Sequence, residues 1–123
     1  MRAPMRVLVT LFLSFGLIGC ERNGGSDLAA AESASRGLSP QDKALAGIYD
    51  RSCRSCHTIA ATGAPLTGDE SAWKIRMDKG MSTLVDNVIN GFGGMPPFGM
   101  CMDCGQQEFE ALIVFMATAE SSP

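Results

Sequence analysis

The stretch Cys53-Arg54-Ser55-Cys56-His57 decides how this chain folds. Its two thiols are three positions apart at the end of an expected helix, and an imidazole follows the second thiol directly. This spacing is typical of c-type haem attachment, because two thiols so placed can add to the two vinyl groups of one porphyrin. The imidazole of His57 would then lie under the iron. A bare Cys-x-x-Cys also suits a thioredoxin-like redox pair, but the adjacent histidine favours haem.

The second axial ligand of such an iron is expected to be a methionine sulfur. His57 is the only histidine of the 123 residues, which also excludes a metal site made of two or three histidines within one chain. Met95 is the candidate, because flanking glycines let the backbone approach a ligand and Pro96-Pro97 stiffens the loop. Met100 and Met102 are rival ligands. Three other methionines are expected to pack in the core: Met77, Met81 and Met116.

Signals for helices surround the motif, and no segment alternates polar and apolar residues like a strand. Ser39 followed by Pro40 predicts a helix start, while Asp69 and Ser82 are expected N-caps further on. The chain is therefore expected to be all-α, with about four short helices around one covalent haem and a Gly/Pro-rich loop over residues 91–99. The expected helices run from Ser39 into Cys53, from Glu70 to Lys79, from Ser82 to Asn90 and from Gln106 to Ala119.

The N-terminal residues read as an export signal. Arg2 and Arg6 flank the apolar run Val7 to Ile18, which is too short to span a bilayer of about 30 Å. The run ends in Leu17-Ile18-Gly19-Cys20, which resembles the lipobox of bacterial lipoproteins, so residues 1–19 are a predicted signal peptide and Cys20 a predicted lipid carrier. Ordinary cleavage after Ser14-Phe15-Gly16 is the alternative. The predicted location is the periplasmic side of a bacterial membrane, or the soluble periplasm if no lipid is attached.

The segment after Cys20 is expected to be a flexible tether. Residues 20–38 are rich in Gly, Ser and Ala and show little apolar periodicity, so the haem domain is assigned to residues 39–123. Net charge is −3, and removal of the leader leaves eight basic against thirteen acidic residues, or −5. No run of Lys or Arg is long enough to follow a phosphate backbone, so nucleic acid is not an expected partner.

From Tyr49 to Met116 the chain closely resembles cytochrome c₅, within the class I c-type cytochromes. The resemblance rests on the haem motif and on a series of short matches: Gly63-Ala64-Pro65, Gly68-Asp69, Ala72-Trp73, Lys79-Gly80-Met81, Asn90-Gly91, Met95-Pro96-Pro97 and Cys101-Met102-Asp103-Cys104. It implies a class I cytochrome c fold, one covalent haem c attached through Cys53 and Cys56, and His57 and Met95 as axial ligands. The leader falls outside the resemblance.

The resemblance also implies roles for several other residues. Pro65 matches the proline whose carbonyl meets the axial imidazole, and such a bond would fix the tautomer of the ring. The resemblance suggests that Trp73 and Arg76 lie near a haem propionate, whereas a large aromatic side chain such as Trp73 is ordinarily a core residue. Cys101 and Cys104 are expected to form a disulfide, which closes too small a loop to contribute more than about 2 kcal/mol and would mainly shape the turn. A zinc site made from both Cys pairs is a minor alternative.

These observations predict a single-haem electron carrier rather than an enzyme, because both axial positions of the iron would be filled. Its expected partners are redox proteins, a donor and an acceptor, and the membrane through the lipid on Cys20. Two other readings stay open. In one, Met95 is labile and the iron binds a small ligand such as peroxide. In the other, a Cys pair acts as a thiol–disulfide module.

Overall fold

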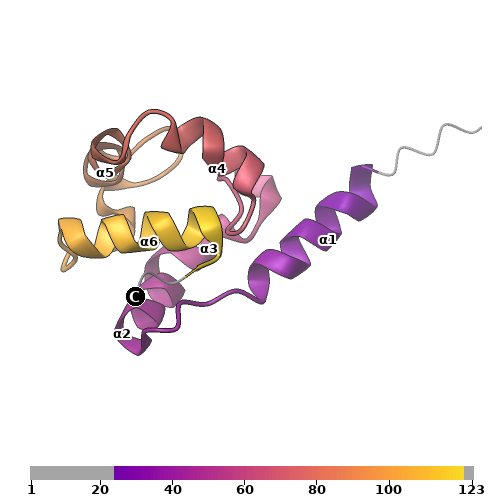
Figure 1. Cartoon of the computed structure of the whole chain (residues 1–123), viewed down its shortest axis with the longest axis horizontal. Coiled ribbons are helices and arrows are strands. Elements are labelled where there is room, and N and C mark those ends of the chain that lie inside the picture. The colour runs from indigo at the N-terminus through magenta and orange to yellow at the C-terminus, as the bar shows by residue number, and fades with distance from the viewer. Residues whose placement is uncertain (1–23, 121–123) are drawn as a thin grey trace, which may run out of the picture.

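In the computed structural model, residues 24–120 are described, and their regular elements are all helical (Figure 1). An all-α fold is thereby confirmed. Besides the six α-helices there is a π-helical turn at Tyr49–Cys53 and there are 3₁₀ turns at Ala60–Thr62 and Pro97–Met100. The α-helices are α1 (Gly24–Arg36), α2 (Lys43–Ile48), α3 (Arg54–His57), α4 (Glu70–Met77), α5 (Met81–Asn90) and α6 (Gln106–Thr118).

Two of the predicted helix starts are wrong and one is confirmed. Asp42, not Ser39, caps α2, because its carboxylate accepts the backbone N–H of Leu45 at 2.7 Å. Helix α5 begins at Met81 directly after Gly80, whose φ of 88° is one that glycine adopts without strain, and Ser82 lies inside the helix. Asp69 caps α4 as predicted, through the N–H of Ala72 at 3.0 Å.

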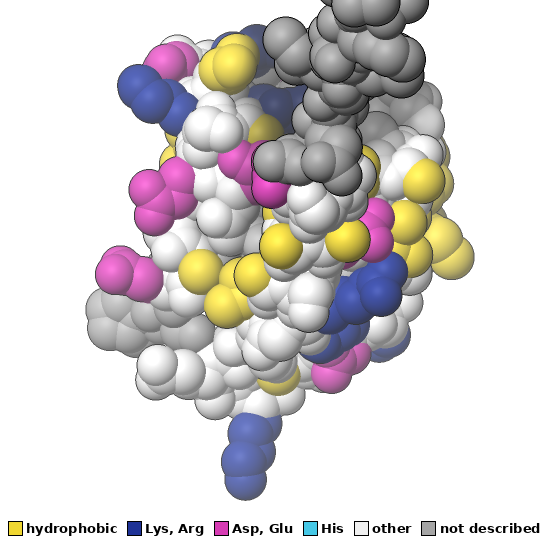
Figure 2. Space-filling model, turned by 90° about the vertical axis from the view of Figure 1, so that its right-hand side faces the viewer, with side chains coloured by type: hydrophobic (Ala, Val, Ile, Leu, Met, Phe, Trp, Pro, Cys, Tyr) yellow, Lys and Arg dark blue, Asp and Glu magenta, His cyan; other side chains and the backbone are white. Residues whose placement is uncertain are grey.

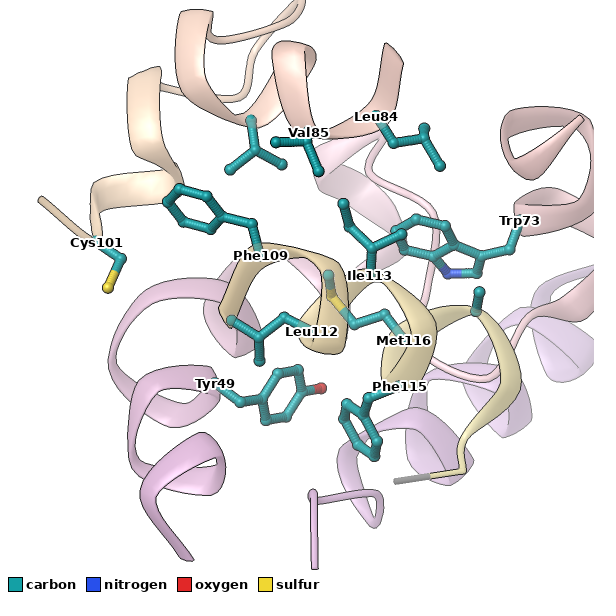
Figure 3. Packing of buried hydrophobic residues seen from close by; sticks show 12 residues of the cluster. Tyr49, Trp73, Leu84, Val85, Cys101, Phe109, Leu112, Ile113, Phe115 and Met116 are labelled. Carbon is teal, nitrogen blue, oxygen red and sulfur yellow. The ribbon is translucent and has the colours of Figure 1, made fainter. Parts of the chain in front are cut away.

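Helix α6 runs through the middle of the molecule, with α4 and α5 on one side and α2 on the other (Figure 1). Figure 3 shows its side chains leaving in two directions: Phe109 and Ile113 toward Val85 and Trp73, Phe115 toward Tyr49. Phe115 is only 1% exposed although it points away from Phe109 and Ile113. The helix therefore buries more than one face. Burying a large aromatic side chain of this kind contributes about 2–3 kcal/mol.

The π-helical turn at Tyr49–Cys53 carries the chain from α2 into the haem motif. Tyr49 is fully buried and meets the ring of Phe115 edge-on, with ring centres 5.1 Å apart. Its hydroxyl shares a hydrogen bond of 2.9 Å with the Thr67 hydroxyl, which satisfies both polar groups inside the core. This tyrosine fixes the start of the motif to the loop that follows it.

The flexible conformation expected for the tether is wrong for most of its length, because Gly24–Arg36 forms helix α1. The run Leu28-Ala29-Ala30-Ala31 has strong intrinsic helix propensity, which needs no apolar periodicity to act. The helix extends away from the body and meets it at its C-terminal end (Figure 1). Cys20 and the leader lie outside the described residues. Among the helices of residues 24–120, none has the length and apolar character needed to cross a membrane.

Candidate haem site

The haem motif spans the end of the π-helical turn and all of α3. Cys53 is half-buried, and burial raises the pKa of its thiol to about 11, so the thiol is neutral at pH 7. Cys56 is exposed on the next turn. The two thiols thus differ in environment although they belong to one short helical segment.

His57 is the best-fixed side chain of the site. It is 7% exposed, and its ring Nδ1 lies 2.8 Å from the backbone carbonyl of Pro65. A carbonyl only accepts, so Nδ1 carries the proton and the lone pair of the neutral ring is on Nε2. Burial lowers the pKa of His57, which favours that neutral form. A neutral imidazole with Nδ1 occupied is the tautomer that binds a metal through Nε2.

Trp73 lies beside this imidazole. The two rings are stacked with centres 5.8 Å apart, and the indole N–H donates to the Leu66 carbonyl at 2.9 Å. Arg76 lies one turn further along α4, where its guanidinium donates to the Ala72 carbonyl at 2.6 Å and lines a surface hollow with Pro65. The structure therefore gathers His57, Pro65 and Trp73, with Arg76 at the margin of the group.

Met95 is half-buried in the loop between α5 and the Pro97–Met100 turn. Its backbone pairs with that of Phe92 through two hydrogen bonds of 3.0 and 3.1 Å. Gly91, with a φ of 80°, approaches this loop so closely that a Cβ there would lie 2.9 Å from the Met95 carbonyl oxygen. The rival methionines Met100 and Met102 are 69% and 73% exposed.

Cys53 and Met95 border the same apolar pocket, although they are far apart in the sequence. Besides Cys53, Met95 and Gly99, the residues that line it are hydrophobic: Val88, Phe98, Cys101, Phe109, Leu112, Ile113 and Met116. The cavity itself is small, about 20 Å³, so it would have to widen to hold a porphyrin; its apolar lining, with one thiol and one thioether, suits such a large apolar ring in chemistry. The donor set and the lining therefore fit haem.

The turn from Cys101 to Cys104 lies beside the motif. The structure pairs these cysteines, with Cα atoms 5.4 Å apart, and Cys101 is 1% exposed. Arg51, from the π-helical turn, donates to both carboxylate oxygens of Asp103 at 2.9 Å and to the sulfur of Cys101 at 3.3 Å. Among residues 24–120, the clustered metal-ligand side chains are Cys101, Asp103 and Cys104. The zinc alternative is unsupported there, because neither Cys53 nor Cys56 joins them.

Sequence reasoning missed the residues that hold the motif from outside. Ser35 of α1 donates to the His57 carbonyl, and Arg51 fixes the second Cys pair. Nothing in the sequence near either residue marks its role. Ser35 lies in a Ser/Ala-rich stretch, and the aspartate that Arg51 binds is 52 positions away, so both look like ordinary surface residues. Only the folded chain brings them to the site.

Known proteins resemble this chain over most of the folded region. A family model described as cytochrome c oxidase, cbb3-type, subunit III matches residues 40–116. Cytochrome c5 of Ectopseudomonas mendocina is 38% identical over 72 residues, which cover 57% of this chain and 83% of that protein. Cytochrome c5 of Azotobacter vinelandii is 40% identical over 68 residues, 54% of this chain and 82% of that protein. The chain belongs to the cytochrome c₅ family.

This cytochrome c₅ family member also resembles a protein of known structure. It is similar to a chain in a crystal structure of an electron transfer complex of nitrite reductase with cytochrome c, with 31% identity and a TM-score of 0.53 over 62% of this chain and 93% of that one. Cytochrome c-555 of Chlorobaculum tepidum is 48% identical over 46 residues, 37% of this chain and 43% of that protein. The chain is a single-haem electron-transfer cytochrome with one covalently bound haem c.

Proposed function

We propose that Cys53 and Cys56 attach the haem through thioether bonds and that His57 and Met95 are its axial ligands. The observation that carries this assignment is the hydrogen bond from His57 Nδ1 to the Pro65 carbonyl, because it leaves Nε2 as the nitrogen with a free lone pair. Met95, which lines the apolar pocket together with Cys53, would supply the soft thioether. The haem contributes an iron that gains and loses one electron at a time.

The chain's own residues would keep that iron in one environment during electron transfer. Pro65 holds the tautomer of His57, and the apolar lining excludes water from the ring. Trp73 fixes the Pro65–Leu66 loop through its indole N–H and stacks on the imidazole. Arg76 is proposed to face a haem propionate from the margin of the site. With little rearrangement possible around His57, this side of the site would change little between the two oxidation states.

Optical spectra of the haem-loaded chain test this assignment against the labile-Met95 alternative. Filled axial positions predict a low-spin spectrum with a methionine–iron band and no change on adding peroxide. A high-spin spectrum that responds to small ligands would instead favour ligand binding at the Met95 side. Acid–acetone extraction is the companion test, because covalent haem c stays with the denatured polypeptide.

The thiol–disulfide alternative has little structural support. Exchange requires an accessible thiolate, whereas the raised pKa of about 11 keeps the Cys53 thiol protonated at pH 7. The second pair is equally unsuited, since Cys101 is 1% exposed. We propose that the Cys101–Cys104 bond is a permanent structural disulfide that shapes the turn before α6. Thiol titration of the haem-loaded protein should find no reactive cysteine among these four.

We further propose that the chain acts on the periplasmic side of a bacterial membrane, anchored by lipid on Cys20. The support is the leader and its lipobox pattern. With a mature net charge of −5, the chain has no polybasic patch that would bind anionic lipid by charge. Attachment should therefore resist high salt. In a membrane fractionation, Cys20→Ser should leave the membrane or accumulate as precursor while its haem domain still folds. Wild-type protein in the soluble fraction, with an N-terminus other than Cys20, would contradict the anchor.

The partners are proposed to be an electron donor and an electron acceptor of the same compartment. The relative found in a complex with nitrite reductase shows that a chain of this fold can dock on a redox enzyme. On the face drawn in Figure 2, basic and acidic side chains are interspersed rather than gathered by sign. Docking on that face would therefore depend less on long-range electrostatic steering than on local fit. Co-purification from solubilised membranes is the experiment that identifies the partners.

A further inference from the structure

Helix α1 reaches the haem motif through a few polar contacts at its C-terminal end. Ser35 is 1% exposed, in contrast to most of the helix, whose side chains are open to solvent. Its hydroxyl donates to the backbone carbonyl of His57 at 3.1 Å. A buried polar side chain on an otherwise exposed helix marks the point where that helix is held. Here the helix is held at His57, the residue that we propose as an axial ligand.

The His57 carbonyl receives a second hydrogen bond, from the N–H of Thr67 at 2.7 Å. The ring of the same residue donates to Pro65 at 2.8 Å. His57 is thus bound through its carbonyl by Ser35 and Thr67 and through its ring by Pro65. Two bonds on one carbonyl restrict rotation of that peptide group, and the peptide group sets the direction of the side chain.

Glu32, one turn before Ser35, contacts the same loop. Its Oε1 accepts the backbone N–H of Ala60 at 2.7 Å, and its Oε2 forms an ion pair of 3.1 Å with Arg36. Ala60 begins the 3₁₀ turn that leads to Pro65. Arg54 adds a contact in the reverse direction, since its guanidinium donates to the carbonyls of Arg36 and Leu38. The end of α1 therefore holds both His57 and the beginning of the loop that carries Pro65.

We propose that Ser35 is a positioning residue for the His57 imidazole, with Glu32 as its support on the loop. This inference rests on the proposed axial role of His57. Both residues precede the region matched by the family model, which begins at residue 40. Ser35 acts by holding the His57 carbonyl, so that the ring keeps its bond to Pro65 and its orientation toward the metal.

The experiment uses the full-length chain loaded with haem and compares Ser35→Ala with Ser33→Ala. Ser33 lies on the same helix and is exposed, so it controls for the change of a serine in α1. NMR measures how fast the His57 Nδ1 proton and the Thr67 amide proton exchange with solvent. Loss of one neutral hydrogen bond should speed both exchanges about fivefold in Ser35→Ala and leave them unchanged in Ser33→Ala. The hyperfine-shifted signals of the His57 ring should also move.

Further variants keep the proposal testable if Ser35→Ala does not accumulate. Glu32→Gln keeps an acceptor for Ala60 but loses the charge, so a smaller rise in His57 exchange is expected. Ser35→Thr retains the hydroxyl and should restore the slow exchange. If the exchange rate of the His57 Nδ1 proton is unchanged in both Ser35→Ala and Glu32→Gln, the inference is overturned. The proposed function still stands in that case, provided that the chain carries covalent haem. If the wild-type chain holds no covalent haem, the proposed function fails first.

Discussion

The two sides of the proposed haem site are built by different means. On the His57 side, a 7% exposed residue is held by a bond from Ser35, 22 positions away, and by one to Pro65, 8 positions away. On the Met95 side, the backbone bonds of the ligand run to Phe92, three residues away. One side is fixed by long-range contacts and the other by the local shape of a loop.

The loop on the Met95 side also carries backbone strain. Phe98 and Met100 have φ values of 58° and 67°, in the left-handed region that residues other than glycine rarely adopt. Such residues cost of order 1–3 kcal/mol each and persist because the surrounding structure imposes them. Phe92 and Met100 are moreover more than half exposed. From this comparison we expect the loop around Met95 to lose its structure before the surroundings of His57 when the protein is destabilised.

The largest effect is expected from removing the covalent attachment of the haem, on which both sides of the site depend. Changing Cys53 and Cys56 together to Ala should abolish covalently bound haem, because no thiol remains at the motif to add to the vinyl groups. A haem-dependent domain of about 85 residues then loses its core organiser, so little folded protein is expected. The measurement is haem retained after acid–acetone extraction, together with circular dichroism. Haem that stays bound to the double variant would show that attachment lies elsewhere.

Met95→Ala should remove the proposed ligand on the Met95 side and leave the His57 side of the site unchanged. The methionine–iron band should disappear, the reduction potential should fall because the thioether favours ferrous iron, and added imidazole should bind. The His57 bond to Pro65 should persist, since both of its partners lie outside the loop of residues 91–99. Optical titration with imidazole and NMR of the His57 ring proton follow the two sides separately. An unchanged spectrum would assign the ligand to Met100 or Met102.

Gly91→Ala tests whether loop shape alone maintains the Met95 side. Alanine at a φ of 80° is strained, and its Cβ would lie 2.9 Å from the Met95 carbonyl oxygen, so a loss of about 1–3 kcal/mol in unfolding free energy is expected. Gly93→Ala is the matched control, because its φ of 59° is also positive but nothing lies within 4 Å of the added carbon. Chemical denaturation measures both. Equal losses would mean that backbone conformation, not the close approach, dominates.

The smallest effect concerns the ion pair between Arg51 and Asp103, which joins the π-helical turn before the motif to the Cys101–Cys104 turn. The hydrogen bonds from Arg51 lower the pKa of the Asp103 carboxyl. A carboxyl whose pKa is lowered by folding stabilises the fold at pH values above its ordinary pKa of about 4, and that contribution is lost as the pH falls through the lowered value. Asp103→Asn should therefore be slightly less stable than wild type at pH 7 and equal to it in strong acid. Denaturation midpoints at both pH values provide the check. A difference that survives in acid would exclude the ion pair as its cause.

The helices that carry their own signals could be predicted from the sequence. Asp69 and the apolar face of α6 act within a few residues, so α4 and α6 match expectation closely. The start of α2 was mispredicted because two segments, Ser39-Pro40 and Asp42, offer the same capping chemistry. Helix α1 is not predicted from apolar periodicity, because its stability comes from the helix propensity of alanine and not from a periodic apolar face.

The candidate site divides in the same way. The proposed ligands and attachment cysteines belong to short motifs, so the sequence alone is enough to propose them. Pro65 was implied only by the resemblance, and the structure shows its carbonyl bonded to the imidazole. The contacts of Ser35 and Arg51 span 22 and 52 positions, and nothing local to either residue marks them. Such contacts depend on how the helices pack.

The docking of α1 has a practical consequence for anyone who produces this cytochrome. A recombinant chain trimmed to residues 40–116, the matched region, would keep every proposed haem ligand but would lose the hydroxyl of Ser35 and the Leu38 carbonyl that Arg54 contacts. Potentials or stabilities measured on the trimmed chain would then describe a different histidine environment from that of the natural protein. Affinity tags belong after residue 120, and the N-terminal boundary belongs before residue 24.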